Sequence, residues 1–234
     1  MDSNNARFAA EYRALRIREG WAGADGREDP AAGPRHLWVP RLEAVRRAAA
    51  QLSDLIRDEA RPPLILDVGS GGGWAARWLK PFKVIAIDLL PPTPLSTQSV
   101  RADMRRLPLC TESADGALFV ASLHYAPVDD VIPEAARVLR PGGMMVAVAS
   151  PIYPDKASQI SARSRSAEYY ARAGFPELVD RYHPIETGEL RSALERSGFR
   201  ILRFEGVSRI ETLWRGLTRQ APNSLVAAQK ISRP

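Results

Sequence analysis

The chain has 234 residues, of which 45% are hydrophobic and 26% charged, and its formal net charge is +6. This length and composition predict one globular unit with its own core, not a disordered or fibrous chain. Cys110 is the only cysteine, which excludes an intrachain disulfide and a cysteine-rich metal site. We expect Cys110 to be a small buried side chain rather than a catalytic thiol, and we expect no bound metal.

The positive charge is mostly arginine, spread along the whole chain with acids between, so we do not expect a nucleic acid partner. The N-terminus lacks a basic segment followed by an apolar one, and the longest apolar run, about residues 144–149, is too short to cross a bilayer. We therefore expect a soluble, cytoplasmic protein without a membrane span.

Two helices are predicted before the first strand. Residues 4–19 place apolar side chains at helical spacing, and so does a second segment from Leu42 to Ile56, which ends before Pro62-Pro63. We expect residues 1–61 to form an N-terminal helical cap and residues 62–234 to form the core.

From Leu64 onward, short apolar runs alternate with helices. The runs at 64–68, 83–88, 116–122 and 143–149 predict strands buried on both faces. A helix around residues 131–139, ended by Pro141-Gly142-Gly143, separates the last two runs, and such alternation predicts parallel strands with right-handed crossovers. A helix over 187–197 and strands over 199–204 and 225–231 complete the pattern.

The segment of about 151–186 interrupts this rhythm with a polar stretch that carries several aromatic residues. It follows the carboxyl end of a strand, which is where ligands bind in open α/β sheets. We therefore expect it to form a lid over that edge.

Residues 67–74, Asp-Val-Gly-Ser-Gly-Gly-Gly-Trp, join the first strand to the next helix. Glycine lets the backbone turn tightly and approach a ligand, and the following helix offers free N–H groups. A dehydrogenase is an alternative for such a loop. Its dinucleotide-binding fingerprint needs Gly or Ala where this chain has Trp74, so the sequence argues against a dehydrogenase.

The Gly-x-Gly-x-Gly run after an acid-bearing strand resembles the class I S-adenosylmethionine-dependent methyltransferases. Further segments agree in order, namely Asp88 after the second strand and residues 101–104, 115–125, 137–143 and 189–199. The segment 137–143, Arg-Val-Leu-Arg-Pro-Gly-Gly, is similar to that of small-molecule members such as the ubiquinone/menaquinone-biosynthesis group. The resemblance spans about residues 64–231 and implies a Rossmann-like, doubly wound α/β sheet of seven strands, the last antiparallel.

The resemblance also implies S-adenosylmethionine as the cofactor. Asp88 would accept hydrogen bonds from both ribose hydroxyls, and Asp103 would receive the adenine amino group. The candidate cofactor residues are Asp67, Gly69, Ser70, Gly71, Gly73, Trp74, Asp88, Leu89, Asp103, Met104 and Ala121. The alternatives are plain turn glycines, a helix-capping Asp88 and an Asp103 that only pairs with flanking arginines.

Methyl transfer from a sulfonium depends mainly on alignment, and a base is needed only where the acceptor must lose a proton. Candidate catalytic residues are His124 and His183, since a neutral imidazole could take a proton near pH 7. Candidate acceptor contacts are Tyr12, Trp38, His124, Tyr125 and Tyr153. The alternative for His124 is a hydrogen bond to the loop backbone.

These patterns predict a methyltransferase acting on a small organic acceptor, with oxygen as the favoured atom. The fourth strand ends in Ala121-Ser122-Leu123-His124 and not in the Asp/Asn-Pro-Pro-aromatic pattern of enzymes that methylate amino groups of bases. An RNA or protein methyltransferase, favoured by the charge, and a non-catalytic cofactor-binding relative are the alternatives.

Overall fold

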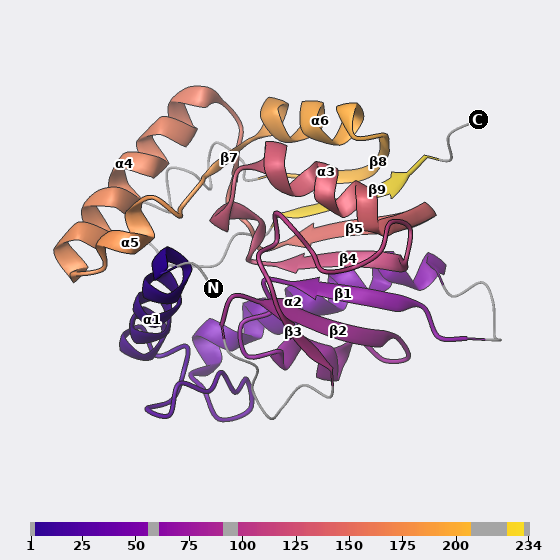
Figure 1. Cartoon of the computed structure of the whole chain (residues 1–234). Coiled ribbons are helices and arrows are strands. Elements are labelled where there is room, and N and C mark those ends of the chain that lie inside the picture. Colours follow the sequence, from indigo (N-terminus) through magenta and orange to yellow (C-terminus); the bar gives the residue numbers. More distant parts are fainter. Residues whose placement is uncertain (1–2, 56–60, 91–97, 207–223, 232–234) are drawn as a thin grey trace.

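The computed structural model describes residues 3–55, 61–90, 98–206 and 224–231. Within them, seven strands pair in the order β3-β2-β1-β4-β5-β9-β8, with helices on both faces of the sheet (Figure 1). The strands are β1 Leu64–Val68, β2 Lys83–Asp88, β3 Ser99–Arg101, β4 Ala114–Val120, β5 Leu139–Val148, β8 Phe199–Glu205 and β9 Leu225–Lys230. The first five are parallel, and β9 runs antiparallel to both β5 and β8. The predicted Rossmann-like fold is confirmed.

The strands read as continuous apolar runs because both faces of the sheet are covered. In β4, Leu118 packs into the cluster under helix α2 (Arg35–Leu52), whereas its neighbour Phe119 packs into the cluster on the opposite face. That opposite face is covered by α3 (Val128–Val138) and α6 (Thr187–Arg196). Alternate side chains of one strand thus enter two separate cores.

Several helices and strands begin or end at residues other than those predicted. Helix α2 begins at Arg35, before the predicted apolar stripe, because Trp38 is buried and packs edge-on against Trp21 and Trp74. The glycine-rich loop leads into a short 3-10 helix, Trp74–Trp78, instead of a full α-helix.

The predicted third and fourth strands also differ in their limits. The strand predicted to end at Ser122 ends at Val120, because Ala121 takes a positive φ of 52°. The turn predicted at Pro141-Gly142-Gly143 lies inside β5, where the register with β4 shifts. Cys110 is exposed, so the expectation of a buried side chain is wrong: it lies on the surface segment between β3 and β4.

The segment of about 151–186 is more helical than its polar sequence indicated. It contains β6 (Ile152–Tyr153), α4 (Lys156–Ala173), α5 (Pro176–Val179) and β7 (Ile185–Glu186), and β6 pairs with β7 in a separate two-stranded sheet. Asp155 caps α4 by accepting from the Ser158 N–H at 2.8 Å.

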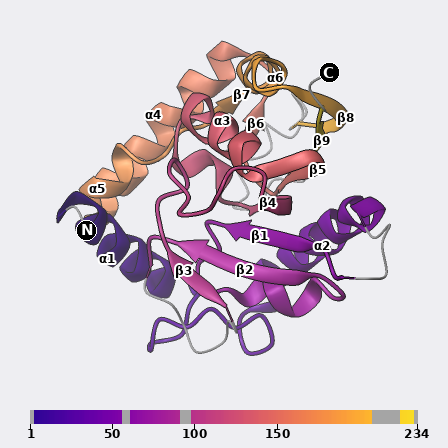
Figure 2. The ribbon, with the colours of Figure 1, turned by 45° about the vertical axis from the view of Figure 1, so that its right-hand side comes forward.

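Helix α1 (Ser3–Arg18) lies beside α4 and α5 at one end of the sheet (Figures 1 and 2). The Glu177 N–H donates to the Glu11 carboxylate at 2.9 Å, and the Tyr169 hydroxyl donates to Glu19 at 2.6 Å. The N-terminal helix and the 151–186 segment therefore close over the same edge together. None of the described helices is long and apolar enough to cross a membrane.

Asp115 joins the beginnings of three strands and generates a stability prediction. Its carboxylate accepts from both terminal nitrogens of Arg61 at 2.7 and 2.9 Å, from the Leu64 N–H at 2.8 Å and from Arg140 at 2.7 Å. Burial acts to raise the pKa of Asp115, but these hydrogen bonds outweigh it and lower that pKa to about 2.

We expect Asp115→Asn to lower the free energy of unfolding at pH 7 by about 1–2 kcal/mol, since charged hydrogen bonds are lost. Because the folded-state pKa lies below the ordinary value, this stabilisation is full above about pH 4 and is lost as the pH falls toward 2. Urea unfolding of both proteins at pH 7 and pH 3 measures the difference. An equal difference at all pH values would contradict the assignment.

Candidate active site

A cavity lies at the carboxyl ends of β1, β2 and β4. The strand ends and their loops form one wall, and side chains from α1, α2 and the loop between them form the other. Ligand sites in open α/β sheets lie at this edge.

The glycine-rich loop forms the floor of the cavity. Gly69, Gly71 and Gly73 all have positive φ, at 71°, 56° and 72°. A Cβ atom at position 69 would lie 2.4 Å from the Ser122 Cβ, so only glycine fits between β1 and β4 there. The N–H groups of Gly69 and Ser70 donate to the Ile87 carbonyl at 2.8 and 3.1 Å, which ties the loop to β2.

Asp67 is fully buried at the end of β1, and neither of its carboxylate oxygens has a hydrogen-bond partner among the described residues. Burial, followed by the charges of Asp88 and Glu28, raises the pKa of Asp67 to about 7. A buried carboxylate without partners is costly, so its presence in a cavity indicates a ligand group that donates to it.

Asp88 ends β2 and is tied to the glycine loop. One carboxylate oxygen accepts from the Gly71 N–H at 2.7 Å and the other from the Leu90 N–H at 2.8 Å. Burial raises the pKa of Asp88 to about 6, although these two hydrogen bonds act to lower it. Each oxygen has a second lone pair, so Asp88 can organise the loop and still accept from a ligand.

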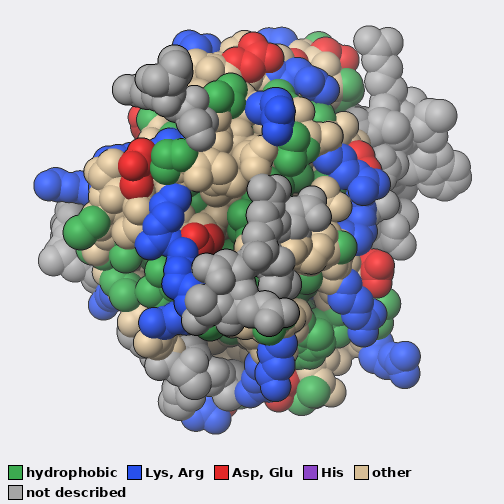
Figure 3. Space-filling model, turned by 90° about the vertical axis from the view of Figure 1, so that its right-hand side faces the viewer, with side chains coloured by type: hydrophobic (Ala, Val, Ile, Leu, Met, Phe, Trp, Pro, Cys, Tyr) green, Lys and Arg blue, Asp and Glu red, His purple; other side chains and the backbone are tan. Residues whose placement is uncertain are grey.

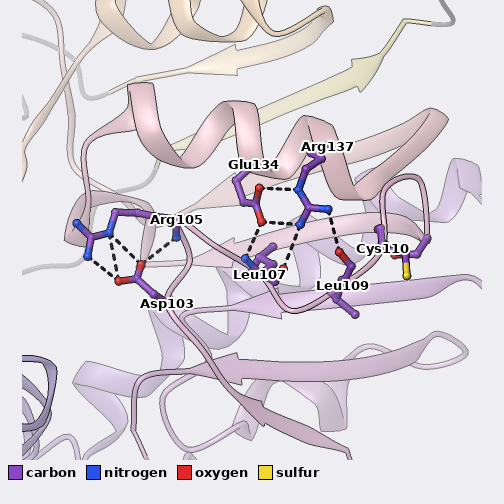
Figure 4. A network of polar contacts seen from close by, with 8 residues as sticks. Asp103, Arg105, Leu107, Leu109, Cys110, Glu134 and Arg137 are labelled. Atoms are coloured by element: carbon purple, nitrogen blue, oxygen red, sulfur yellow. Dashed lines mark hydrogen bonds and ion pairs between the residues drawn. The ribbon is translucent and has the colours of Figure 1, made fainter. Parts of the chain in front are cut away.

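Asp103 and Met104, which follow β3, also line the cavity. The Asp103 carboxylate accepts hydrogen bonds from the Arg105 backbone N–H at 2.9 Å and from the Arg105 guanidinium at 2.6 to 3.2 Å. Asp103 therefore both lines the cavity and forms a salt bridge with a flanking arginine. The segment is held on α3 by Glu134, which accepts from the Leu107 N–H at 2.6 Å and pairs with Arg137 at 2.7 Å (Figure 4).

The aromatic candidates separate into two groups. Tyr12, Trp38, His124 and Tyr125 line the cavity, and the Tyr12 and Tyr125 rings meet edge-on with centroids 5.4 Å apart. Tyr153, a buried residue of β6, does not line the cavity.

Two other sequence candidates lie outside the cavity lining. His183 faces a separate groove beside Lys156, Gln159 and Arg163, and its backbone N–H donates to the His124 carbonyl at 2.7 Å. Gly73 does not line the cavity either, although it shapes the loop. The remaining cofactor candidates from the sequence, including Trp74, Leu89 and Ala121, do line it.

His124 is buried, and its Nδ1 has no hydrogen-bond partner among the described residues. Burial, followed by the charges of Arg41 and Arg16, lowers the pKa of His124 to about 3. Its imidazole is therefore neutral near pH 7, as expected, and it is a weaker base than an ordinary histidine.

The sequence analysis did not identify five charged residues that line the cavity: Arg16, Glu28, Arg41, Arg105 and Arg181. Glu28 accepts from the Gly72 N–H and from Arg16 Nε, both at 3.3 Å, although it lies 44 residues before Gly72. Such contacts depend on how the cap docks, and no local spacing indicates them. Within the described parts of the chain, no three acidic, histidine or cysteine side chains cluster as a metal site would require.

Comparisons with known proteins agree with this geometry. Residues 66–147 match the family model described as a methyltransferase domain. No curated protein matches the sequence.

Solved structures share the fold at low identity. Geranyl diphosphate methyltransferase in complex with GPP and sinefungin has a TM-score of 0.60 at 17% identity, over 80% of this chain and 77% of that one. A second structure is the 1,6-didemethyltoxoflavin-N1-methyltransferase of Burkholderia thailandensis with bound 1,6-didemethyltoxoflavin and S-adenosylhomocysteine. Its TM-score is 0.58 at 21% identity, over 97% of this chain and 91% of that one. The [4+2]-cyclase SpnF has a TM-score of 0.53 at 17% identity, over 80% and 81%.

The matched domain spans β1 to β5, which carry the glycine loop, Asp67 and Asp88. The sheet order and the antiparallel β9 match the expected fold over the rest of the core. Residues 66–147 therefore match a methyltransferase domain, and the described parts of the chain share the fold of solved S-adenosylmethionine-dependent methyltransferases.

Proposed function

We propose that this chain transfers a methyl group from S-adenosylmethionine to an oxygen of a small organic acceptor. The observation that carries the proposal is a single cavity with two unlike walls. Acids with vacant acceptor positions line the sheet side, and aromatic rings from the cap and from the end of β4 line the other. We also retain the division into a cap of residues 1–61 and a core of residues 62–234 with a lid at about 151–186.

The acids suit the polar groups of S-adenosylmethionine. The unpartnered carboxylate of Asp67 would accept from the ammonium group, and Asp88 would accept from the ribose hydroxyls. Leu89, Asp103 and Met104 would contact the adenine, while the glycine loop, Trp74 and Ala121 would face the methionine part.

When bound, S-adenosylmethionine supplies an electrophilic methyl carbon, whose transfer forms an O–C bond, breaks the S–C bond and leaves a neutral thioether. The protein's own part is to hold the acceptor in line and to exclude water. His124, with a pKa of about 3, cannot take a proton efficiently, and His183 lies outside the cavity. We therefore propose that the acceptor oxygen is ionised before it reacts and that His124 positions it through a hydrogen bond.

A small acceptor is also supported by the bound molecules named for the two methyltransferases above. The rival is an RNA or protein methyltransferase. On the face shown in Figure 3, lysine and arginine side chains lie at many separate places with acids among them, which differs from the continuous basic stripe typical of nucleic acid binding. A non-catalytic cofactor-binding relative is the second rival, and the occurrence of the same fold in a [4+2]-cyclase shows that the fold is not restricted to methyl transfer.

We expect Asp88→Ala to weaken S-adenosylhomocysteine binding by roughly 30- to 150-fold, on the order of 2–3 kcal/mol, because a charged two-point contact is lost. Isothermal titration calorimetry measures the affinity directly. Asp129→Ala is the control, since Asp129 is an exposed acid of α3 that pairs with Arg196. Unchanged affinity in a folded Asp88→Ala protein would remove Asp88 from the cofactor site.

Methyl transfer itself is tested with radiolabelled S-adenosylmethionine and extract of the source cells. We expect the label in the small-molecule fraction, with none above background when Asp88→Ala replaces the wild type. Label in the RNA or protein fraction would favour the first rival. No label anywhere from a protein that binds S-adenosylhomocysteine would favour the second.

A further inference from the structure

Charged side chains of both signs line the cavity. The acids Asp67, Asp88 and Glu28 lie against the glycine loop, where they act on one another electrostatically. The arginines Arg16 and Arg41 project from α1 and α2 on the cap side. A ligand in the cavity therefore meets these acids at the glycine loop and these arginines on the cap side, and Arg105, paired with Asp103, and Arg181 also line it.

The two arginines differ in how their charge is balanced. Arg16 pairs with Glu28 at 3.3 Å and with Glu19 at 3.9 Å. Arg41 forms no ion pair with any described residue, and its buried Nε has no hydrogen-bond partner among them. Its guanidinium lies over the Trp21 ring, 4.9 Å from the centroid.

Arg41 keeps its charge in spite of this setting. Burial and the charge of Arg16 lower the pKa of Arg41 to about 10, so the guanidinium is still protonated near pH 7. The buried Nε of this charged group lacks the hydrogen bond that normally offsets burial, and an oxyanion of a ligand would supply it.

Arg41 faces the acceptor end of the cavity. Its charge acts on His124 more strongly than that of Arg16 does, and His124 follows β4 at the strand edge. Tyr125 lies against His124 with ring centroids 4.4 Å apart, and Tyr12 meets Tyr125 edge-on. The unbalanced cation is thus next to an aromatic wall suited to a flat apolar body.

We infer that the acceptor is an organic anion whose carboxylate or phosphate is bound by Arg41, with its apolar body between Tyr12 and Tyr125. The guanidinium offers parallel N–H groups that match either oxyanion. This inference rests on the proposed function and names the substrate class of the same site. The methionine carboxylate of the cofactor is the other source of such a group, and the experiment distinguishes the two.

The first measurement separates the small molecules of a source-cell extract on an anion exchanger before any reaction. The retained and unretained fractions are then each incubated with the protein and radiolabelled S-adenosylmethionine. We expect the methyl-accepting compound in the retained fraction. Label only in the unretained fraction would overturn the inference and leave methyl transfer to a small molecule intact. Label in neither fraction would overturn both.

The second measurement uses Arg41→Met, with Arg46→Met as the control because Arg46 is exposed on the same helix and pairs only with Glu43. We expect Arg41→Met to bind S-adenosylhomocysteine within about threefold of the wild type, but to lose labelling of the retained fraction by about 30-fold or more. Arg41→Lys, which keeps the charge, should recover part of the labelling.

The cofactor alternative gives the opposite result. If Arg41 held the methionine carboxylate, Arg41→Met would weaken S-adenosylhomocysteine by tenfold or more and leave the binding of its decarboxylated analogue unchanged. That pattern would overturn the inference. Melting temperatures of all variants show whether they fold, and the extract fractionation needs no variant at all.

Discussion

The carboxylate of Asp67 lies at the centre of the sheet edge, fully buried and without a hydrogen-bond donor from any described residue. The adjoining loop is closely packed, since Gly69 fits against Ser122 where no side chain could, and the Gly71 N–H donates to Asp88. The same constraint fixes where β1, β2 and β4 end and so defines one wall of the cavity. A cationic ligand group would relieve the cost of leaving Asp67 unpaired.

The second wall comes from far away in the sequence and is joined to the first by packed rings. Trp21, Trp38 and Trp74 form a row with successive ring centroids 5.4 and 5.0 Å apart, which links the cap to the helix after the glycine loop. Glu28 reaches the same loop from the cap through Gly72. Cap docking therefore builds the cavity and completes the core under α2 at the same time.

Sequence reasoning succeeded where local pattern determines structure. The bounds of β1 and β2 were predicted as observed, because a strand buried on both faces has an apolar run that both begins and ends abruptly. It was less accurate where tertiary contacts decide: α2 extends back to Arg35 because Trp38 finds a buried partner. The position of His124 followed from the end of β4, but its low basicity did not, since that depends on burial beneath the cap and on Arg41. No sequence pattern distinguished Arg41 as a site residue, because it is one of 33 lysines and arginines in the chain.

Proton release on cofactor binding tests the role of Asp67 most directly. With a pKa of about 7, Asp67 is largely protonated at pH 6.5 in the free protein and should ionise when an ammonium group binds beside it. Calorimetric titration of S-adenosylhomocysteine at pH 6.5, in buffers of different ionisation enthalpy, counts these protons. We expect the wild type to release roughly half a proton or more beyond Asp67→Asn, which should also bind more weakly. Equal proton counts and equal affinity in the two proteins would contradict the assignment of Asp67 to the cofactor.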